Sequence, residues 1–246
     1  NIRFGSSLRR RQPMSQKAEA VPFKRRHRVW TRTMRHVVRI AVPMAAGVAI
    51  FVALAPFPEA LLSPPPRSLE LTDRNGLLLR EVLDDGDRFT RPIGIGELPR
   101  HLLLATLAAE DKRFYHHHGV DPLAIVRAMC SAARHGRIKS GGSTITQQLV
   151  KITENNHRRR TPGLKLVETI AAIKLDALWP KDRILEAYLN RLDYGNLRIG
   201  CAAAARFYFD KHISDLSIAE AAQLAALPRS PGRLNPLRDP SAAREA

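Results

Sequence analysis

The sequence predicts a mostly α-helical domain with a short β-hairpin at its N-terminal side, preceded by one transmembrane helix. From Leu98 onward, apolar residues recur at a spacing of three and four, which is the period of an amphipathic helix. Asn75 and Gly76 stand between two short strand-like runs, and this pair is typical of a hairpin turn. The transmembrane helix is predicted from a charge-free apolar stretch ahead of the hairpin. With 246 residues, of which 44% are hydrophobic, there is room for one ordinary domain with a sizeable core.

Residues 1–39 form a basic tail. They contain 12 Lys or Arg residues and one acid, Glu19, so they contribute +11 of the formal net charge of +17. Clustered arginines can neutralise nucleic-acid phosphates, but an apolar segment follows this tail directly. Basic residues beside an apolar segment are typical of the cytoplasmic flank of a membrane anchor. We therefore expect no nucleic-acid partner.

The membrane anchor is predicted at residues 40–58, IAVPMAAGVAIFVALAPFP, which carry no charge. This length is close to the roughly 20 residues that cross a bilayer core and exceeds the roughly 7 to 15 of a signal-peptide core. A cleaved signal peptide and a buried core helix are the alternatives, because Pro43 and the small residues after it weaken a helix. The charge bias places the N-terminus in the cytoplasm. We expect a single-pass protein of the inner (cytoplasmic) membrane whose C-terminal domain is extracytoplasmic and faces the periplasm.

A proline-rich spacer is predicted at residues 59–67, followed by one domain at 68–246. The domain is expected to start with the hairpin, whose strands are Ser68–Thr72 and Leu77–Val82. The helices predicted after it are Leu98–Phe114, Pro122–His135, Thr144–Ile152, Leu164–Leu178, Lys181–Leu192, Cys201–Phe209 and Ser217–Leu227. Core packing is expected for most apolar residues at 102–104 and 122–129, with contact to the bilayer interface as the alternative.

A carboxylate pair, Glu110 and Asp111, follows the apolar run of the first of these helices. Burial at the mouth of an apolar segment can make a carboxylate basic enough for proton transfer at neutral pH. Glu110 is therefore the first candidate for a catalytic base, and a solvated helix end is the plainer interpretation. The three histidines at 116–118 suggest a metal, but adjacent residues do not share a face, so we expect no histidine-bound metal there.

Residues 140–151, SGGSTITQQLVK, predict a loop that runs into a helix. Glycines let backbone amides approach a ligand closely, Ser143 or Thr144 can cap the helix, and the helix N-terminus suits an anion such as a diphosphate. An ordinary N-cap is the alternative. The polar side chains expected along one side of a cleft are Thr146, Gln147, Gln148 and Lys151.

Lys165 and Glu168 fall three residues apart on one predicted helix. As an exposed ion pair they would contribute only about 0.2 to 0.5 kcal/mol. As functional groups, Lys165 would hold a phosphate and Glu168 would supply the second carboxylate of the site. Cys130 and Cys201 lie in apolar helical stretches, where Cys usually behaves as a small hydrophobe, so we expect free thiols.

Two motifs in order resemble a known family. The first is Glu-Asp-x-x-Phe-x-x-His-x-Gly, which covers Glu110 to Gly119, and the second is Gly-Gly-Ser-Thr-x-Thr-Gln-Gln at 141–148. Together they resemble the peptidoglycan glycosyltransferases of glycosyltransferase family 51, the transglycosylase domains of class A penicillin-binding proteins. Stretches at 183–200 and 216–236 are similar to the family's fourth and fifth motifs and read as mostly structural. The residues at 136–142 and at the end of the fifth motif are most similar to those of the 1C type of penicillin-binding protein.

The chain departs from the family pattern at two positions. The third motif, Arg-Lys-x-x-Glu, aligns with residues 164–168, where Leu164 replaces the arginine, and Ile152 stands where the family usually has Asn. The arginines at 158–160 are candidates to supply the missing phosphate contact. No Ser-x-x-Lys motif of a transpeptidase domain occurs in the chain, so we expect no penicillin-sensitive acyl transfer from it.

The resemblance implies a lysozyme-like glycosyltransferase domain that polymerises lipid II into β-1,4 glycan strands during cell wall biosynthesis and releases undecaprenyl diphosphate. It implies Glu110 as base, Glu168 as the second catalytic carboxylate, and Mg²⁺ or Mn²⁺ held near Glu168. The implied partners are lipid II, the growing glycan strand, the lipid bilayer and other cell-wall synthesis proteins. The substrate-binding residues that it implies are Asp111, Phe114, His117, Gly142, Ser143, Thr144, Thr146, Gln147, Gln148, Lys151, Lys165 and Asn190.

Two other functions remain open from the sequence. A lysozyme-like muramidase would use one buried glutamate but would not need Lys151, Lys165 or a diphosphate loop. A catalytically inactive wall-binding scaffold is favoured by Leu164, whereas retention of both Glu110 and Glu168 argues against it.

Overall fold

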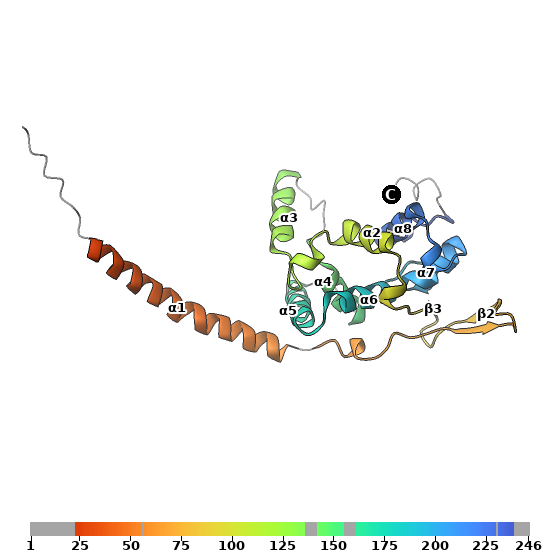
Figure 1. Cartoon of the computed structure of the whole chain (residues 1–246), viewed down its shortest axis with the longest axis horizontal. Coiled ribbons are helices and arrows are strands. Elements are labelled where there is room, and N and C mark those ends of the chain that lie inside the picture. The colour runs from red at the N-terminus through yellow and green to blue at the C-terminus, as the bar shows by residue number, and fades with distance from the viewer. Residues whose placement is uncertain (1–22, 56, 136–141, 155–160, 230, 239–246) are drawn as a thin grey trace, which may run out of the picture. The chain divides into compact units, whose positions relative to one another are not determined.

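A computed structural model describes residues 23–55, 57–135, 142–154, 161–229 and 231–238 (Figure 1). The chain separates into two compact units, residues 1–49 and 50–246. In its described part, the first unit consists of most of helix α1, which spans Phe23–Leu54. The end of this helix and all other helices and strands belong to the second unit, which carries the candidate site.

Helix α1 differs from the predicted anchor at both ends. It begins at Phe23, inside the basic tail, because the last part of the tail continues into the apolar stretch as one unbroken helix, and it holds Pro43 in its interior. It ends at Leu54 rather than at Pro58, because a proline has no backbone N–H with which to continue the helical hydrogen bonds. Within the described part of the chain, no helix has both the length and the apolar character that crossing a membrane requires.

The hairpin is confirmed. Strand β1 (Leu69–Thr72) pairs antiparallel with β2 (Leu78–Val82). The turn is held by Asp73, whose Oδ1 accepts a hydrogen bond from the backbone N–H of Leu77 at 2.8 Å. Gly76 has a φ of +83°, a left-handed conformation that glycine adopts without the steric cost of a Cβ atom.

The helical prediction is also confirmed, with bounds that shift by a few residues. The predicted first helix stops at Glu110 rather than Phe114, because Asp111 leaves the helical region with a φ of −154° and the chain turns into a short 3₁₀ helix. The α-helices after the hairpin are α2 (Arg100–Glu110), α3 (Pro122–His135), α4 (Ile145–Thr153), α5 (Pro162–Leu178), α6 (Lys181–Arg191), α7 (Cys201–Phe209) and α8 (Ile218–Ala226). The 3₁₀ helices are η1 (Glu59–Leu61), η2 (Ile95–Glu97), η3 (Phe114–His116), η4 (Ile213–Asp215) and η5 (Leu227–Arg229).

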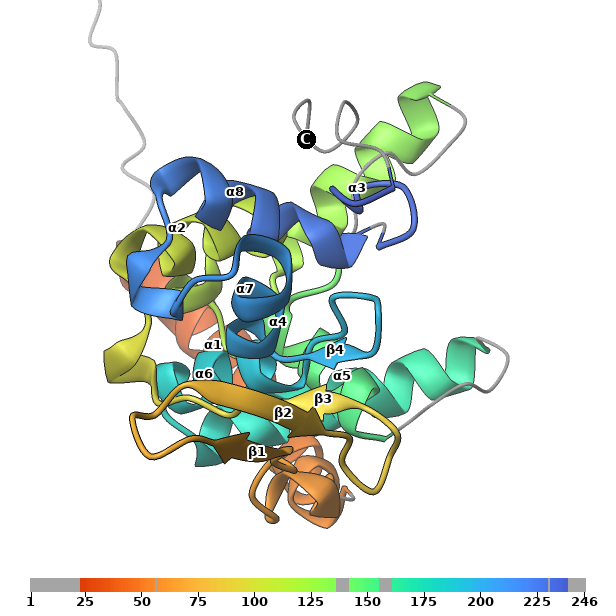
Figure 2. The same ribbon diagram turned by 90° about the vertical axis from the view of Figure 1, so that its right-hand side faces the viewer.

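A second, parallel strand pair was not predicted. Strand β3 (Phe89–Thr90) lies beside β4 (Arg198–Ile199), as Figure 2 shows. The guanidinium of Arg198 lies over the ring of Phe89 at 3.7 Å and pairs with Glu81 of β2 at 2.6 Å. These contacts connect the hairpin side of the domain to the segment between α6 and α7.

The core forms where helices distant in the sequence pack together. Helix α2 packs against α8, and α4 packs against both α5 and α6 (Figure 2). Among the fully buried side chains are Leu102 of α2, Leu149 of α4, Leu175 of α5, Leu185 of α6 and Leu224 of α8. This packing brings the C-terminal end of α2 beside α4, so residues 110 and 148 can meet.

Helix α3 does not follow the expectation of core packing. Its apolar side chains Leu123, Val126 and Met129 are exposed to 55%, 55% and 67%, because no element covers this side of the helix in the described part of the chain. Leu104 of α2 is also exposed, whereas Leu102 is fully buried. Core packing is therefore wrong for the outward side of α3.

Both cysteines are free thiols, as predicted. Cys130 is exposed on α3 and Cys201 is buried at the start of α7. Complete burial raises the pKa of the Cys201 thiol to about 12, so it stays protonated and packs as a small apolar group.

Candidate functional site

Glu110, the last residue of α2, is held at both carboxylate oxygens. Gln148 of α4 donates from Nε2 to Oε2 at 2.9 Å, and Arg229 at the end of η5 donates from Nε to Oε1 at 2.9 Å. The Glu110 side chain is 12% exposed, whereas that of Arg229 is 55% exposed. The predicted base is thus largely buried and fixed in orientation by two different elements.

Gln148 is itself fixed from behind. The hydroxyl of Tyr188, fully buried on α6, donates to Oε1 of Gln148 at 3.1 Å. Burial raises the pKa of Tyr188 well above its usual range, so the hydroxyl keeps its proton and remains a donor. This bond leaves the Gln148 amide N–H groups directed to Glu110 and fixes which end of the amide faces the carboxylate.

Asp111 holds the start of α4 against the end of α2. Its Oδ2 accepts a hydrogen bond from the backbone N–H of Ile145 at 3.1 Å and lies 2.9 Å from Nε2 of His117. His117 and Phe114 are both buried, with ring centroids 6.3 Å apart. The neighbouring residues 116 and 118 are exposed, so the three histidines do not meet at one point.

The loop before α4 forms a capping box. The Thr144 hydroxyl accepts from the backbone N–H of Gln147 at 3.2 Å, and Oε1 of Gln147 accepts from the backbone N–H of Thr144 at 3.2 Å. Thr144 also donates to the carbonyl of Gly119 at 2.6 Å. Thr146 is completely buried, with its hydroxyl 3.5 Å from Asp176. The predicted loop-to-helix transition is confirmed, and these three side chains mainly hold protein partners.

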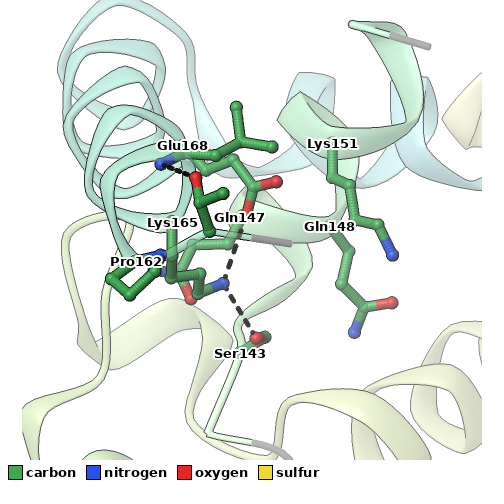
Figure 3. A pocket seen from close by; sticks show the side chains of 9 residues that line it. Ser143, Gln147, Gln148, Lys151, Pro162, Lys165 and Glu168 are labelled. Atoms are coloured by element: carbon green, nitrogen blue, oxygen red, sulfur yellow. Dashed lines mark hydrogen bonds and ion pairs between the residues drawn. The ribbon is translucent and has the colours of Figure 1, made fainter. Parts of the chain in front are cut away.

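A cleft of about 550 Å³ lies along the outer side of α4 and the start of α5. Nζ of Lys165 lies 3.1 Å from Oγ of Ser143 and 3.5 Å from Oε2 of the largely buried Glu168, while Gln148 and Lys151 reach in from α4 (Figure 3). We call it the lysine cleft, and its lining residues are Ser143, Gln147, Gln148, Lys151, Thr161, Pro162, Leu164, Lys165 and Glu168. Its two ammonium groups suit an anionic ligand.

A second cleft of about 680 Å³ opens on the other side of Gln148. We call it the arginine cleft, and its lining residues are Ala108, Ala109, Glu110, Asp111, Lys112, Arg113, Asp121, Ala124, Arg127, Ser143, Thr144, Gln148 and Arg229. Ser143 and Gln148 line both clefts. The two predicted catalytic carboxylates therefore face adjacent spaces: Glu110 the arginine cleft and Glu168 the lysine cleft.

Several residues predicted to bind substrate lie outside both clefts. Phe114, His117 and Thr146 belong to the interior. Asn190 is buried and uses both ends of its amide on Ile93, accepting from its N–H at 3.0 Å and donating to its carbonyl at 2.8 Å. Asn190 thereby fixes the segment that leads into α2.

Gly142 and Leu164 have different surroundings. A Cβ atom at Gly142 would lie 3.6 Å from the Cβ of Ala128 on α3, an ordinary contact, so this glycine is not required for packing space. Leu164 lines the lysine cleft at the position where the family pattern has arginine. The arginines at 158–160, the candidate substitutes, lie outside the described residues.

Sequence reasoning missed two residues of the site, Arg229 and Tyr188. Arg229 lies 119 positions after its partner Glu110, and no spacing rule connects positions so distant. Tyr188 occupies an apolar position in the helical pattern, and it is buried as that pattern predicts. Because the hydroxyl of a buried tyrosine usually has a hydrogen-bond partner, the residue type could have indicated a polar contact here.

The described residues form no group of three or more His, Cys, Asp or Glu side chains that can hold a metal ion. The oxygen donors in the lysine cleft are the Glu168 carboxylate, the Ser143 hydroxyl and side-chain amides. Mg²⁺ is commonly bound through one or two carboxylates together with substrate phosphates. This donor set therefore fits an ion held jointly with an anionic substrate and does not fit an ion held by protein groups alone.

The profile of the transglycosylase family matches residues 76–246, which is most of the chain and includes both clefts. The chain belongs to the transglycosylase family. This confirms the resemblance to the transglycosylase domains of class A penicillin-binding proteins, whereas the likeness to the 1C type and to lysozyme stays a prediction.

Curated relatives of this transglycosylase domain include penicillin-binding protein 1A of Aquifex aeolicus, 40% identical over 211 residues that cover 83% of this chain and 28% of the relative. Penicillin-binding protein 1F of Bacillus subtilis is 39% identical over 178 residues, covering 72% and 24%. The chain thus spans about a quarter of the length of these relatives. Among solved structures, penicillin-binding protein 1A from Haemophilus influenzae aligns with a TM-score of 0.38 and 22% identity, covering 74% of this chain and 17% of that one.

Proposed function

We propose that this transglycosylase domain is a peptidoglycan glycosyltransferase that joins lipid II into β-1,4 glycan strands and releases undecaprenyl diphosphate. The observation that carries the proposal is the pair of adjacent clefts that share Ser143 and Gln148. One cleft presents a fixed carboxylate, Glu110, and the other presents lysines suited to a diphosphate. A glycosyl transfer from a diphosphate-linked sugar needs both functions side by side.

Glu110 would act as the general base. In the proposed step, the 4-hydroxyl of the acceptor sugar attacks the anomeric carbon of the donor while Glu110 takes the hydroxyl proton. The bond between the anomeric carbon and the diphosphate oxygen breaks, the leaving diphosphate takes the electron pair, and the anomeric configuration inverts. The two hydrogen bonds to Glu110 support this role because each carboxylate oxygen can accept a further bond from the acceptor.

Lys151 and Lys165 would hold the donor diphosphate in the lysine cleft and stabilise the negative charge that grows on it. Ser143 and Glu168 support this geometry because both lie beside Nζ of Lys165 and limit where it points. Mg²⁺ or Mn²⁺, held by Glu168 together with the diphosphate, would act there as a Lewis acid when bound.

Asp111, Phe114, His117, Thr144, Thr146, Gln147 and Asn190 would then contribute chiefly by fixing the walls of the clefts. Their contacts support this: Asp111 joins α2 to α4, and Asn190 anchors the approach to α2. Direct contact of these side chains with substrate stays a prediction.

We further propose that the chain is anchored in the inner membrane, with its N-terminus in the cytoplasm and this domain outside. The charge-free residues 40–58 after a tail of net charge +11 support the anchor. The exposed apolar side chains Leu123, Val126 and Met129 on α3 support contact with the bilayer interface. A substrate with a lipid tail that stays in the bilayer explains why the clefts would be kept at the membrane. The proposed partners are lipid II, the glycan strand, the bilayer and other cell-wall synthesis proteins.

The test is incubation of the purified protein with labelled lipid II and Mg²⁺, and in parallel with preformed glycan strands, followed by separation of products by size. The proposal predicts long strands from lipid II and no cutting of preformed glycan. Cutting of glycan with lipid II left intact would identify a muramidase instead. If neither substrate changes and the protein has the circular dichroism spectrum of a folded helical domain, the catalytically inactive wall-binding scaffold is the hypothesis that remains.

A further inference from the structure

Arg229 is a charged group at the candidate base that the proposed chemistry leaves without a task. It stands at the end of η5, directly after α8, and reaches Glu110 across the arginine cleft. Its Nε donates to Oε1 of Glu110 at 2.9 Å, while the neutral amide of Gln148 occupies Oε2 at the same distance. The two partners of the carboxylate thus differ in kind: one is a positive charge and the other is a dipole.

We infer that Arg229 is a positioning residue for the base, holding Oε1 of Glu110 and aiming its carboxylate into the arginine cleft. The inference rests on the proposed function, since it assumes that Glu110 accepts the proton. A hydrogen bond from a guanidinium to a carboxylate is charge-assisted and therefore stronger than one from a neutral amide. Gln148 holds the other oxygen through a neutral amide, so the effects of the two partners can be separated.

The environment of the pair fits this role. The Glu110 side chain is mostly shielded at 12% exposure, where a positive partner counts for more than it does in open solvent. Arg229 is 55% exposed, so solvent partly screens its charge. Helix α8 packs on α2, which ends at Glu110, and η5 with Arg229 follows α8 directly, so the two partners lie on elements that pack together.

Other charged or titratable groups surround Glu110 but do not replace the contact. Those lining the same cleft are Asp111, Lys112, Arg113, Asp121 and Arg127, and those on the buried side are Tyr188 and Tyr194. Asp121 already pairs with Arg113 at 3.6 Å and with Arg127 at 3.5 Å. All of them stay in place when Arg229 alone is changed, so their influence cancels in a comparison of variants.

The test compares wild type with Arg229→Gln and Arg229→Lys in lipid II polymerisation. Arg229→Gln removes the charge-assisted hydrogen bond and should lower kcat by roughly 10- to 100-fold with KM changed less than about threefold, because misplacing a catalytic group lowers the rate of the chemical step. Arg229→Lys keeps a charged donor and should recover part of the lost kcat. Arg206→Gln, which removes an arginine from a surface pair with Asp210 on α7, is the matched control and should behave as wild type.

Two results would overturn the inference. A raised KM with an unchanged kcat would assign Arg229 to substrate binding, and unchanged kcat and KM would leave it no role at the base. A second readout does not depend on turnover: in ¹³C-Glu-labelled protein at pH 7, with the Glu110 signal assigned by its loss in Glu110→Gln, the Glu110 carboxyl signal should shift or broaden in Arg229→Gln and stay at its wild-type position in Arg206→Gln. If wild type forms no strands, the proposed function fails, while this signal still decides whether Arg229 holds the carboxylate.

Discussion

Replacing Gly119 by alanine should destabilise the domain more than any effect of helix propensity can explain. Gly119 has a φ of +75°, and a Cβ atom built there would lie 2.5 Å from the carbonyl oxygen of Ala172 and 2.9 Å from Cα of Ile173, both in the backbone of α5. The left-handed conformation costs a non-glycine residue about 1 to 2 kcal/mol. Overlap with a helix backbone adds about 1 to 3 kcal/mol, because the neighbour cannot rotate away as a flexible side chain would. The expected loss of unfolding free energy is therefore about 2 to 5 kcal/mol.

The assay is urea denaturation of wild type and Gly119→Ala, followed by far-UV circular dichroism. Gly163→Ala is the matched control: apart from its chain neighbours and the adjoining backbone of its own helix, no atom of the described residues lies within 4 Å of its built Cβ. Its φ is not left-handed, and it sits in the first turn of α5. This change should be neutral or stabilise by up to about 1 kcal/mol. If Gly119→Ala unfolded at the same urea concentration as Gly163→Ala, the close approach between this loop and α5 would be wrong.

Three further outcomes follow from the described contacts. Lys165→Met should lower kcat/KM in lipid II polymerisation by roughly 100-fold, because the leaving diphosphate loses one ammonium group that stabilises its negative charge. An unchanged kcat/KM would contradict the lysine cleft as the donor site. Glu220, whose pKa is lowered to about 2 chiefly by its hydrogen bond with Lys211, contributes stability above its unfolded pKa near 4.5 and loses it as the pH falls towards 2. Glu220→Gln should thus destabilise by about 0.5 to 1 kcal/mol at pH 7 and not at pH 2, as thermal melts at the two pH values will show. A maleimide at pH 7 should label the exposed Cys130 but not the buried Cys201, giving one adduct by mass spectrometry before unfolding and two after it; two adducts on the native protein would contradict the burial of Cys201.

Local patterns predicted most helices because apolar periodicity reports one buried face. The bounds of α3 and α7 match the predicted ranges, those of α4 differ by one residue at each end, and those of α6 differ by one residue at the C-terminal end. The early end of α2 could not be predicted, since it depends on the contact of Asp111 with Ile145 and His117, which only the folded chain brings together. Strands of two residues, as in β3 and β4, are too short to show alternation.

The sequence predicted the chemical groups of the site but not which of its residues line the clefts and which are buried in the interior. The motif residues Glu110, Lys165 and Glu168 do line clefts, and residues of the same motifs such as Phe114 do not. A motif records positions that the fold needs as well as positions that the substrate needs, and spacing alone cannot separate the two. Burial and hydrogen-bond partners separate them, and they also add Arg229, which no local pattern connects to the base.

The central claim is that Glu110 serves bond formation rather than binding, and one comparison tests it most directly. Wild type and Glu110→Gln are each given fluorescent lipid II, with the Kd measured first and strand formation measured in a single turnover on the same samples. The account predicts a Kd within about threefold of wild type and a bond-forming rate at least about 100-fold lower, because glutamine fills the same space but cannot accept the proton. Strand formation by Glu110→Gln at the wild-type rate would contradict the claim and would require another base in these clefts.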